Sequence, residues 1–119
     1  MAHRVLFLSW GRASGGREAL ALDLYYELVA LLSELEGADV LERFEIVMLE
    51  PNACLEGFVL VHGSGRQIAA VRQDPRFREL LTAAGLVTRD LRACAGSTGE
   101  GIADVLPLYE EAVDRVAAV

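Results

Sequence analysis

Lysine is absent from this 119-residue sequence, in which all eleven basic residues are arginine. A Walker phosphate loop uses lysine as a point charge, and Schiff-base and pyridoxal-phosphate chemistry use its amine. The sequence therefore excludes all three kinds of site. Eighteen acidic residues give a net charge of -7, which disfavours a nucleic-acid backbone or an anionic membrane as partner.

Cysteine and long apolar runs are also scarce. Cys54 and Cys94 form no CxxC pair, and two cysteines do not make a disulfide framework. No apolar run approaches the ~18 residues of a membrane helix, and the run within the opening MAHRVLFLSWGR is too short for a signal peptide. We therefore expect a reduced, cytoplasmic protein. With 53% hydrophobic residues, residues 1–119 are expected to form a single domain with a real core.

The apolar pattern alternates between strand-like and helix-like segments. Strands are expected over residues 4–10, 43–50, 57–62 and 87–95. Helices are expected over residues 17–36, 64–85 and 103–117. Asp74-Pro75 should break the middle helix, since aspartate is a good N-cap and proline fits the first helical position. Gly37 and Gly85 are expected to end their helices, and Pro107 should lie in the first turn of the last one.

The predicted order of elements is β-α-β-β-α-β-α. The link between the second and third strands is too short for a helix, so these strands should form an antiparallel hairpin. A hairpin between two helical crossovers is the split βαβ pattern of a ferredoxin-like domain, here with an added C-terminal helix. A doubly wound α/β fold would need a helix between all strands. The expected class is α+β, with a four-stranded antiparallel sheet.

The central strands are apolar on both faces. A sheet with helices on one face only should alternate apolar and polar residues. Residues 5–8, 46–49 and 58–61 are instead apolar throughout. The helices can cover one face, and no other element remains for the second face except another copy of the chain. We therefore expect a homodimer that forms through the open sheet face.

Two longer segments carry a resemblance to known proteins, GFVLVHGSGRQIAAVRQDPRF (57–77) and GLVTRDLRACAGSTGEGIADVLPLYEEA (85–112). Through them, residues 44–111 resemble small bacterial proteins of unknown function. The element order and the doubly apolar sheet resemble the dimeric α+β barrel superfamily, which includes antibiotic-biosynthesis monooxygenase-like, muconolactone-isomerase-like, stress-response barrel and YCII-like families. The resemblance implies the fold and a dimer, and by analogy a cofactor-free oxygenase or isomerase. It carries over no active site, because the sites differ between these families.

The segment His62–Arg66 (HGSGR) joins a strand to a helix. Its glycines could expose N–H groups to an anion. However, Ile68 stands where a dinucleotide fingerprint needs a small residue, and the spacing around Ser64 does not fit a GxSxG nucleophile elbow. We favour a turn with Ser64 or Gly65 near the N-cap, and we expect no cofactor. Since His3 is the only other histidine, we also expect no metal site.

His62, Trp10 and Glu50 are the candidates for chemistry, because each lies at or just beyond the end of a predicted strand. His62 could be a general base or ligand, or a histidine satisfied by a backbone carbonyl. If the three side chains meet at one mouth of the sheet, they form a pocket for a small molecule. Trp10 could equally plug the end of the barrel.

Two functional hypotheses follow from these patterns. In the first, the chain is a homodimer that binds a small organic molecule in the barrel, as an oxygenase or isomerase by analogy with the superfamily. In the second, it is a non-enzymatic dimerisation or regulatory module whose apolar sheet face serves association alone. A cavity lined by Trp10 and His62 would favour the first hypothesis, and a filled barrel the second.

Overall fold

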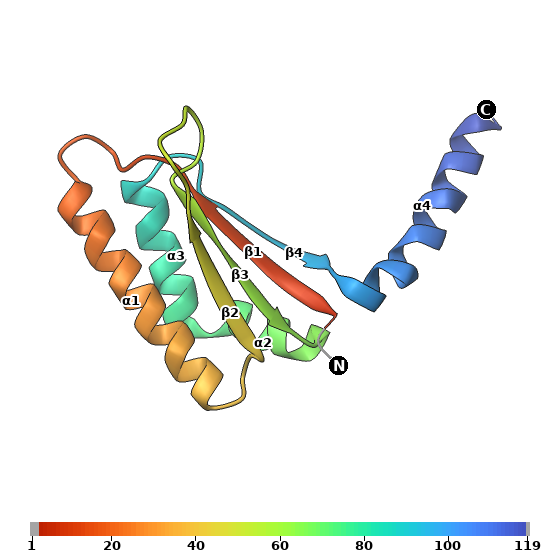
Figure 1. Ribbon diagram of the computed structural model, residues 1–119, viewed down its shortest axis with the longest axis horizontal. Helices are drawn as coiled ribbons and strands as arrows, with labels where there is room; N and C mark the ends of the chain where they lie inside the picture. Colours follow the sequence, from red (N-terminus) through yellow and green to blue (C-terminus); the bar gives the residue numbers. More distant parts are fainter. Residues whose placement is uncertain (1–2, 119) are drawn as a thin grey trace.

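The computed structural model describes residues 3–118 and confirms a single four-stranded antiparallel sheet. The strands are β1 (Arg4–Trp10), β2 (Arg43–Met48), β3 (Gly57–Gly63) and β4 (Arg92–Ser97). The helices are α1 (Glu18–Gly37), α2 (Gly65–Gln73), α3 (Pro75–Val87), the short 3₁₀ helix η1 (Gly99–Gly101) and α4 (Ile102–Ala117). The strand order is β2-β3-β1-β4, so β1 and β3 occupy the centre. This arrangement is ferredoxin-like, with α2 and α3 together forming the second crossover (Figure 1).

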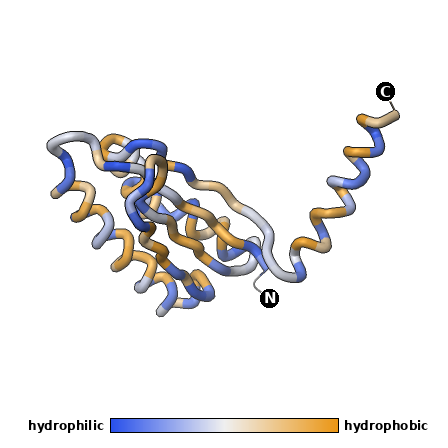
Figure 2. The backbone as a smooth tube through the Cα atoms, turned by 45° about the horizontal axis from the view of Figure 1, so that its top comes forward, coloured by the Kyte–Doolittle hydropathy of each residue, from blue (hydrophilic) through white to orange (hydrophobic). Residues whose placement is uncertain are grey.

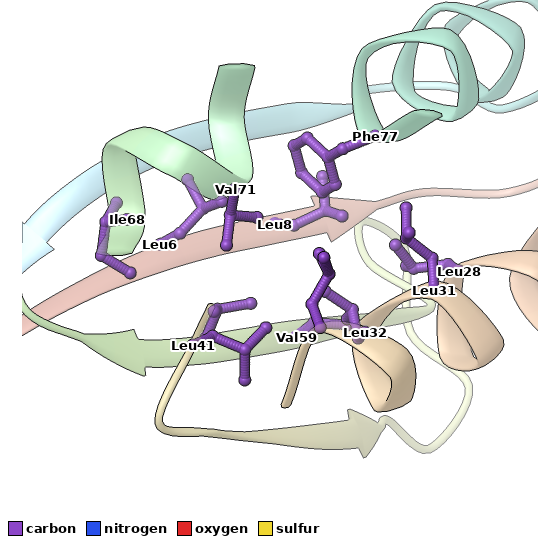
Figure 3. Close-up of a cluster of buried hydrophobic side chains, with 12 residues drawn as sticks. Leu6, Leu8, Leu28, Leu31, Leu32, Leu41, Val59, Ile68, Val71 and Phe77 are labelled. Atoms are coloured by element: carbon purple, nitrogen blue, oxygen red, sulfur yellow. The ribbon is translucent and has the colours of Figure 1, made fainter. Parts of the chain in front are cut away.

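Helices α1, α2 and α3 cover one face of the sheet (Figure 1). Alternate residues of the central strands point toward them and are buried, namely Leu6, Leu8, Val59 and Val61. Figure 3 shows the core side chains of the sheet and of the three helices gathered between the two layers. The helices contribute Leu28, Leu31, Leu32, Leu35, Ile68, Val71 and Phe77. Full burial of one such side chain contributes about 1.5–3 kcal/mol, so this layer supplies most of the driving force for folding.

The predicted break in the middle helix is confirmed at Asp74. The carboxylate Oδ1 of Asp74 accepts hydrogen bonds from the backbone N–H groups of Arg76, at 2.8 Å, and of Phe77, at 3.4 Å. Burial acts to raise the pKa of Asp74, but the side-chain hydrogen bond from Arg76 and the two backbone donors outweigh it and lower the pKa below its usual value. Arg76 also forms an ion pair with Glu34, which ties α3 to α1.

The β2–β3 hairpin forms as predicted, but β2 ends at Met48 rather than at residue 50. Asn52 organises the connection. Its side-chain oxygen accepts hydrogen bonds from the N–H groups of Cys54 and Leu55, and its amide donates to the carbonyl oxygens of Glu50 and Leu55. A side chain that bonds to the nearby backbone competes with the strand ladder. The ladder therefore stops before the predicted end of the strand.

The predictions that Gly85 ends a helix and that a strand begins at Val87 are wrong. Helix α3 continues through Gly85 to Val87. Thr88 stabilises this end, because its backbone N–H and its hydroxyl both bond to the carbonyl of Ala84, at 2.9 and 2.7 Å. Strand β4 therefore begins only at Arg92, at an edge of the sheet.

Helix α4 projects away from the rest of the domain (Figures 1 and 2). Its projection helps to give a radius of gyration of 16.5 Å, against ~13.5 Å for a compact domain of this length. Pro107 is the sixth residue of α4, so its predicted place in the first turn is wrong. The helix has no buried residue, so water can reach the carbonyl that Pro107 leaves without a helical donor. Within residues 3–118, no helix is long and apolar enough to cross a membrane.

The second face of the sheet carries no helix, and we call it the open face. The register places three rows of residues on it, each running from β2 through β3 and β1 to β4. The rows are Arg43-His62-Val5-Gly96, Glu45-Leu60-Phe7-Cys94 and Val47-Phe58-Ser9-Arg92. Most of its large apolar side chains lie on the two central strands, and the rings of Phe7 and Phe58 are 5.4 Å apart. The charged residues stand on the edge strands.

Candidate functional site

A cavity of about 710 Å³ lies between α1, α3 and the end of the sheet that carries Trp10. This volume falls in the range of ~300–1,000 Å³ that is typical of small-molecule sites. Most of its wall is apolar and comes from both helices and from β1. The larger apolar residues of the wall are Leu8, Trp10, Leu22, Leu24, Tyr25, Tyr26, Leu28, Met48, Phe77, Leu80, Leu81, Val87 and Leu91.

Trp10 gives this cavity an aromatic wall. It is the last residue of β1 and lies on the same face of the sheet as Leu8, toward the helices. Its ring centroid is 6.3 Å from that of Tyr25, at an interplanar angle of 57°. Gly57, opposite Trp10 in the ladder, provides the space for the indole. A Cβ at Gly57 would lie 3.1 Å from the indole Cζ2 and 2.7 Å from the carbonyl oxygen of Val47, so a larger residue would displace the ring.

The cavity also has polar groups in its wall. Nε of Arg12 lies 3.9 Å from Oε1 of Glu56, and Glu18 and Thr88 complete the polar lining. The side chain of Arg12 is 79% exposed, so this ion pair contributes little to stability and can exchange partners with a ligand. Among the residues described, the wall contains no histidine and no cysteine. Proton transfer in this cavity would therefore depend on the carboxylates of Glu18 and Glu56 and on the hydroxyls of Tyr25 and Tyr26.

The three candidates Trp10, His62 and Glu50 do not meet at one mouth of the sheet. Strands β1 and β3 are antiparallel, so the end of one lies beside the start of the other. Trp10 consequently pairs with Gly57, whereas His62 pairs with Val5 at the far end of the sheet. Glu50 follows β2 at the Trp10 end, where it is exposed and does not form part of the cavity wall. The structure thus separates His62 from the other two candidates.

His62 lies on the open face, on the opposite side of the sheet from the cavity. Only 8% of the residue is exposed, and its Nε2 lies 3.7 Å from Oε1 of Glu45. Within residues 3–118, neither this buried Nε2 nor the buried Oγ of Ser9 has a hydrogen-bond partner. A buried polar group without a partner costs about 1–3 kcal/mol.

The HGSGR segment forms the predicted strand-to-helix turn, and Ser64 is the N-cap of α2. The hydroxyl of Ser64 accepts from the N–H of Gln67, at 3.1 Å, and the side-chain oxygen of Gln67 accepts from the N–H of Ser64, at 2.9 Å. This capping box was visible in the sequence as Ser-x-x-Gln. It occupies two of the N–H groups that an anion would use.

No cluster of three or more histidine, cysteine, aspartate or glutamate residues within the described part of the chain could hold a metal ion. The sequence analysis missed the helical walls of the cavity, including Tyr25, Leu80 and Leu81. The spacing of residues within one helix does not record which helix packs beside it, so the sequence carried no signal for these walls.

No protein-family model matches this chain, and no curated protein matches it. Several solved structures are similar to it, and three of them are described as dimeric proteins of ferredoxin-like fold. A dimeric ferredoxin-like protein of unknown function from Jannaschia sp. CCS1 has a TM-score of 0.62 at 13% identity, over 80% of this chain and 99% of that one. A dimeric protein of unknown function and ferredoxin-like fold from Bacteroides fragilis NCTC 9343 has a TM-score of 0.58 at 7% identity, over 79% and 95%. A dimeric ferredoxin-like protein of unknown function from Thermobifida fusca has a TM-score of 0.55 at 15% identity, over 82% and 92%.

The match covers nearly the whole length of each of these structures but only about four fifths of this chain. The span from β1 to β4 makes up a similar share of the chain. At such low identity, the likeness concerns the fold alone. It confirms that this chain has a ferredoxin-like α+β fold.

Proposed function

We propose that this chain is a homodimer that binds a small, mostly apolar organic molecule in the cavity beside Trp10. The observation that carries this proposal is the cavity itself, whose volume of about 710 Å³ and largely apolar wall suit a small molecule. The rings of Trp10 and Tyr25 suit a flat, aromatic ligand. Arg12 and Glu56 can bind a polar group of that ligand at the cavity wall. The site thus differs from the predicted one, since it lies outside the barrel and lacks His62.

The open face supports the homodimer. Phe7, Phe58 and Leu60 form a continuous apolar surface there, and two-fold pairing of identical faces is the commonest way to cover such a surface. The similar structures from three bacteria are themselves described as dimeric. We place the dimer in the reducing cytoplasm, because Cys54 and Cys94 are both free.

A non-enzymatic module that uses its apolar sheet face for association alone remains the second candidate, and the open face is the observation that favours it. Within the first proposal, the composition of the cavity favours ligand binding without catalysis. An isomerase or cofactor-free oxygenase would need a general base in the cavity, and Glu18 and Glu56 are the carboxylates in its wall. Neither is held by a histidine or a second carboxylate within the wall. Ligand binding without chemistry therefore needs fewer assumptions than catalysis.

The cavity can be tested by fluorescence, because Trp10 is the only tryptophan of the chain. We expect the dye 1-anilinonaphthalene-8-sulfonate to quench Trp10 in a saturable way, with one dye per chain. Ala84→Phe and Ala21→Phe should each abolish this signal, since both alanines line the cavity. His62→Ala is the matched control and should leave it unchanged. Quenching that persists in both cavity-filling variants, with circular dichroism showing them folded, would overturn the proposal.

A further inference from the structure

Helix α4 carries an apolar stripe that is exposed to solvent and that no other element within residues 3–118 covers. The stripe repeats at intervals of three and four residues, which places it on one face of the helix. Its residues are Ile102, Val105, Leu106, Tyr109, Val113 and Val116, each 44–75% exposed. None of the sixteen residues of α4 is buried, and its principal contact is with η1. An isolated helix of this length is marginal in water, so α4 needs a surface to pack against.

The connection to β4 sets the direction in which α4 leaves the sheet. The N–H of Gly101 bonds to the carbonyl of Thr98, and the N–H of Thr98 bonds to the carbonyl of His3, both at 3.0 Å. Gly101 is buried, and a Cβ at that position would lie 2.6 Å from the carbonyl oxygen of His3. The junction is therefore packed against the start of β1. These contacts hold the segment from which α4 leaves the sheet.

We infer that α4 is an exchanged arm, whose apolar stripe packs on the second copy of the chain that covers the open face. This inference rests on the homodimer proposed above. Figures 1 and 2 show why a second copy fits, because α4 stands clear of the domain that carries it and is free to reach another. In a two-fold dimer each chain would give one arm and receive one.

The exposed surface is large enough for such an interface. A folded monomer of 12.9 kDa exposes ~6,300 Å², whereas this chain exposes 7913 Å². The excess of roughly 1,600 Å² is about twice what each partner buries in an interface of ordinary size. A dimer joined by the sheets alone would leave the stripe in water. Adding the arm buries both apolar surfaces together.

The charges on α4 favour a protein copy over a lipid surface. Its polar side carries Asp104, Glu110, Glu111 and Asp114 but only one arginine, Arg115. Amphipathic helices that bind membranes are instead basic on their polar side, and an acidic one is repelled by anionic lipids. On the edge strands of the open face, the guanidinium of Arg43 already lies 4.0 Å from the carboxylate of Glu45, whereas Arg92 has no ion pair within the described residues, so a second copy offers Arg92 to an acidic helix.

The experiment uses the full chain with charges placed on the stripe. We expect the double variant Leu106→Glu/Val113→Glu to raise the dimer dissociation constant at least 100-fold in sedimentation equilibrium. Glu111→Gln, on the polar side of α4, is the control and should dimerise like the unmodified chain. Because α4 has no buried residue, the domain should stay folded in the double variant. Its circular dichroism should then lose at most the helical signal of α4.

A second measurement identifies what the arm touches. A photoreactive residue, Tyr109→p-benzoylphenylalanine, is introduced into a mixture of ¹⁵N-labelled and unlabelled chains. Adducts that join one heavy and one light chain support the exchanged arm, and the same probe at Glu111 should give few. Adducts formed only within single chains would overturn the inference, since α4 would then lie on its own domain.

The outcomes also separate this inference from the proposals on which it rests. A stripe variant that dimerises as tightly as the unmodified chain would refute the arm and leave the dimer standing. A chain that stays monomeric at tens of micromolar would refute both. Ligand binding in the cavity is measured separately, through the fluorescence of Trp10, so neither outcome decides whether the cavity binds a ligand.

Discussion

Leu60→Asp is the sharpest test of the open face. Leu60 lies in the middle row of that face, with Glu45 on one side and Phe7 on the other. In a monomer the new carboxylate would face water, so the free energy of unfolding should fall by only about 1 kcal/mol. In a dimer joined through the open face it would be buried without a partner, at a cost of about 3 kcal/mol per site. Two-fold symmetry doubles this to about 6 kcal/mol, or a dissociation constant raised about 10⁴-fold.

Sedimentation equilibrium at micromolar concentration measures this change directly. Leu86→Asp makes the same chemical change on α3, where the leucine is 73% exposed and away from the open face, and it should leave the dimer intact. Thermal unfolding shows whether both variants remain folded. The reasoning is refuted if Leu60→Asp dimerises as tightly as Leu86→Asp, or if the unmodified chain sediments as a 12.9 kDa monomer at tens of micromolar.

Three further measurements follow from the structure. The rate of thiol labelling at Cys94 should fall as the protein concentration rises, because Cys94 lies on the open face. Cys54, in the hairpin loop, is the control and should react at a constant rate. A Cys94 rate that does not change with protein concentration would argue against this interface. Asp74→Ala should cost about 1 kcal/mol at pH 7 by removing the α3 cap, measured by thermal unfolding. Because the folded pKa of Asp74 is lowered, this stabilisation is present above the usual carboxyl pKa and is lost as the pH falls through the lowered value, so the two proteins should converge in acid. His62→Ala should alter the dimer dissociation constant and leave dye binding at Trp10 unchanged. Weaker dye binding with an unchanged dissociation constant would place His62 in the ligand site.

Local signals in the sequence predicted most of the fold. The Asp74-Pro75 pair marked a helix break because its capping chemistry is contained in adjacent residues. The short link between β2 and β3 predicted a hairpin for the same reason, since no helix fits into it. The apolar run of residues 5–8 indicated that both faces of β1 need cover. The helix break and the hairpin depend on neighbours in the chain, which is why these two inferences held. The cover of the open face stays a prediction.

The candidate site depended on neighbours in space, and there the prediction failed. Placing His62 beside Trp10 required knowing that β1 and β3 pair antiparallel, and this pairing joins residues some fifty positions apart. The cavity walls from Tyr25 and Leu81 depend on how α1 packs beside α3, which no spacing within either helix records. Trp10 was found because a lone tryptophan at a strand end is conspicuous. Its partner Gly57 was missed because the glycine has a purpose only once the ladder is known.

The positions of Ser9 and Trp10 show how ligand binding and dimer formation could influence each other. These adjacent residues of β1 point to opposite faces of the sheet, Trp10 into the cavity and Ser9 toward the open face. A ligand in the cavity cannot cover the open face, nor supply a partner for the Oγ of Ser9 or the Nε2 of His62, because the sheet lies between them. The two proposed activities therefore occupy separate surfaces of one layer. Any coupling between them has to pass through the backbone of β1, where a shift of the indole would tilt the hydroxyl beside it.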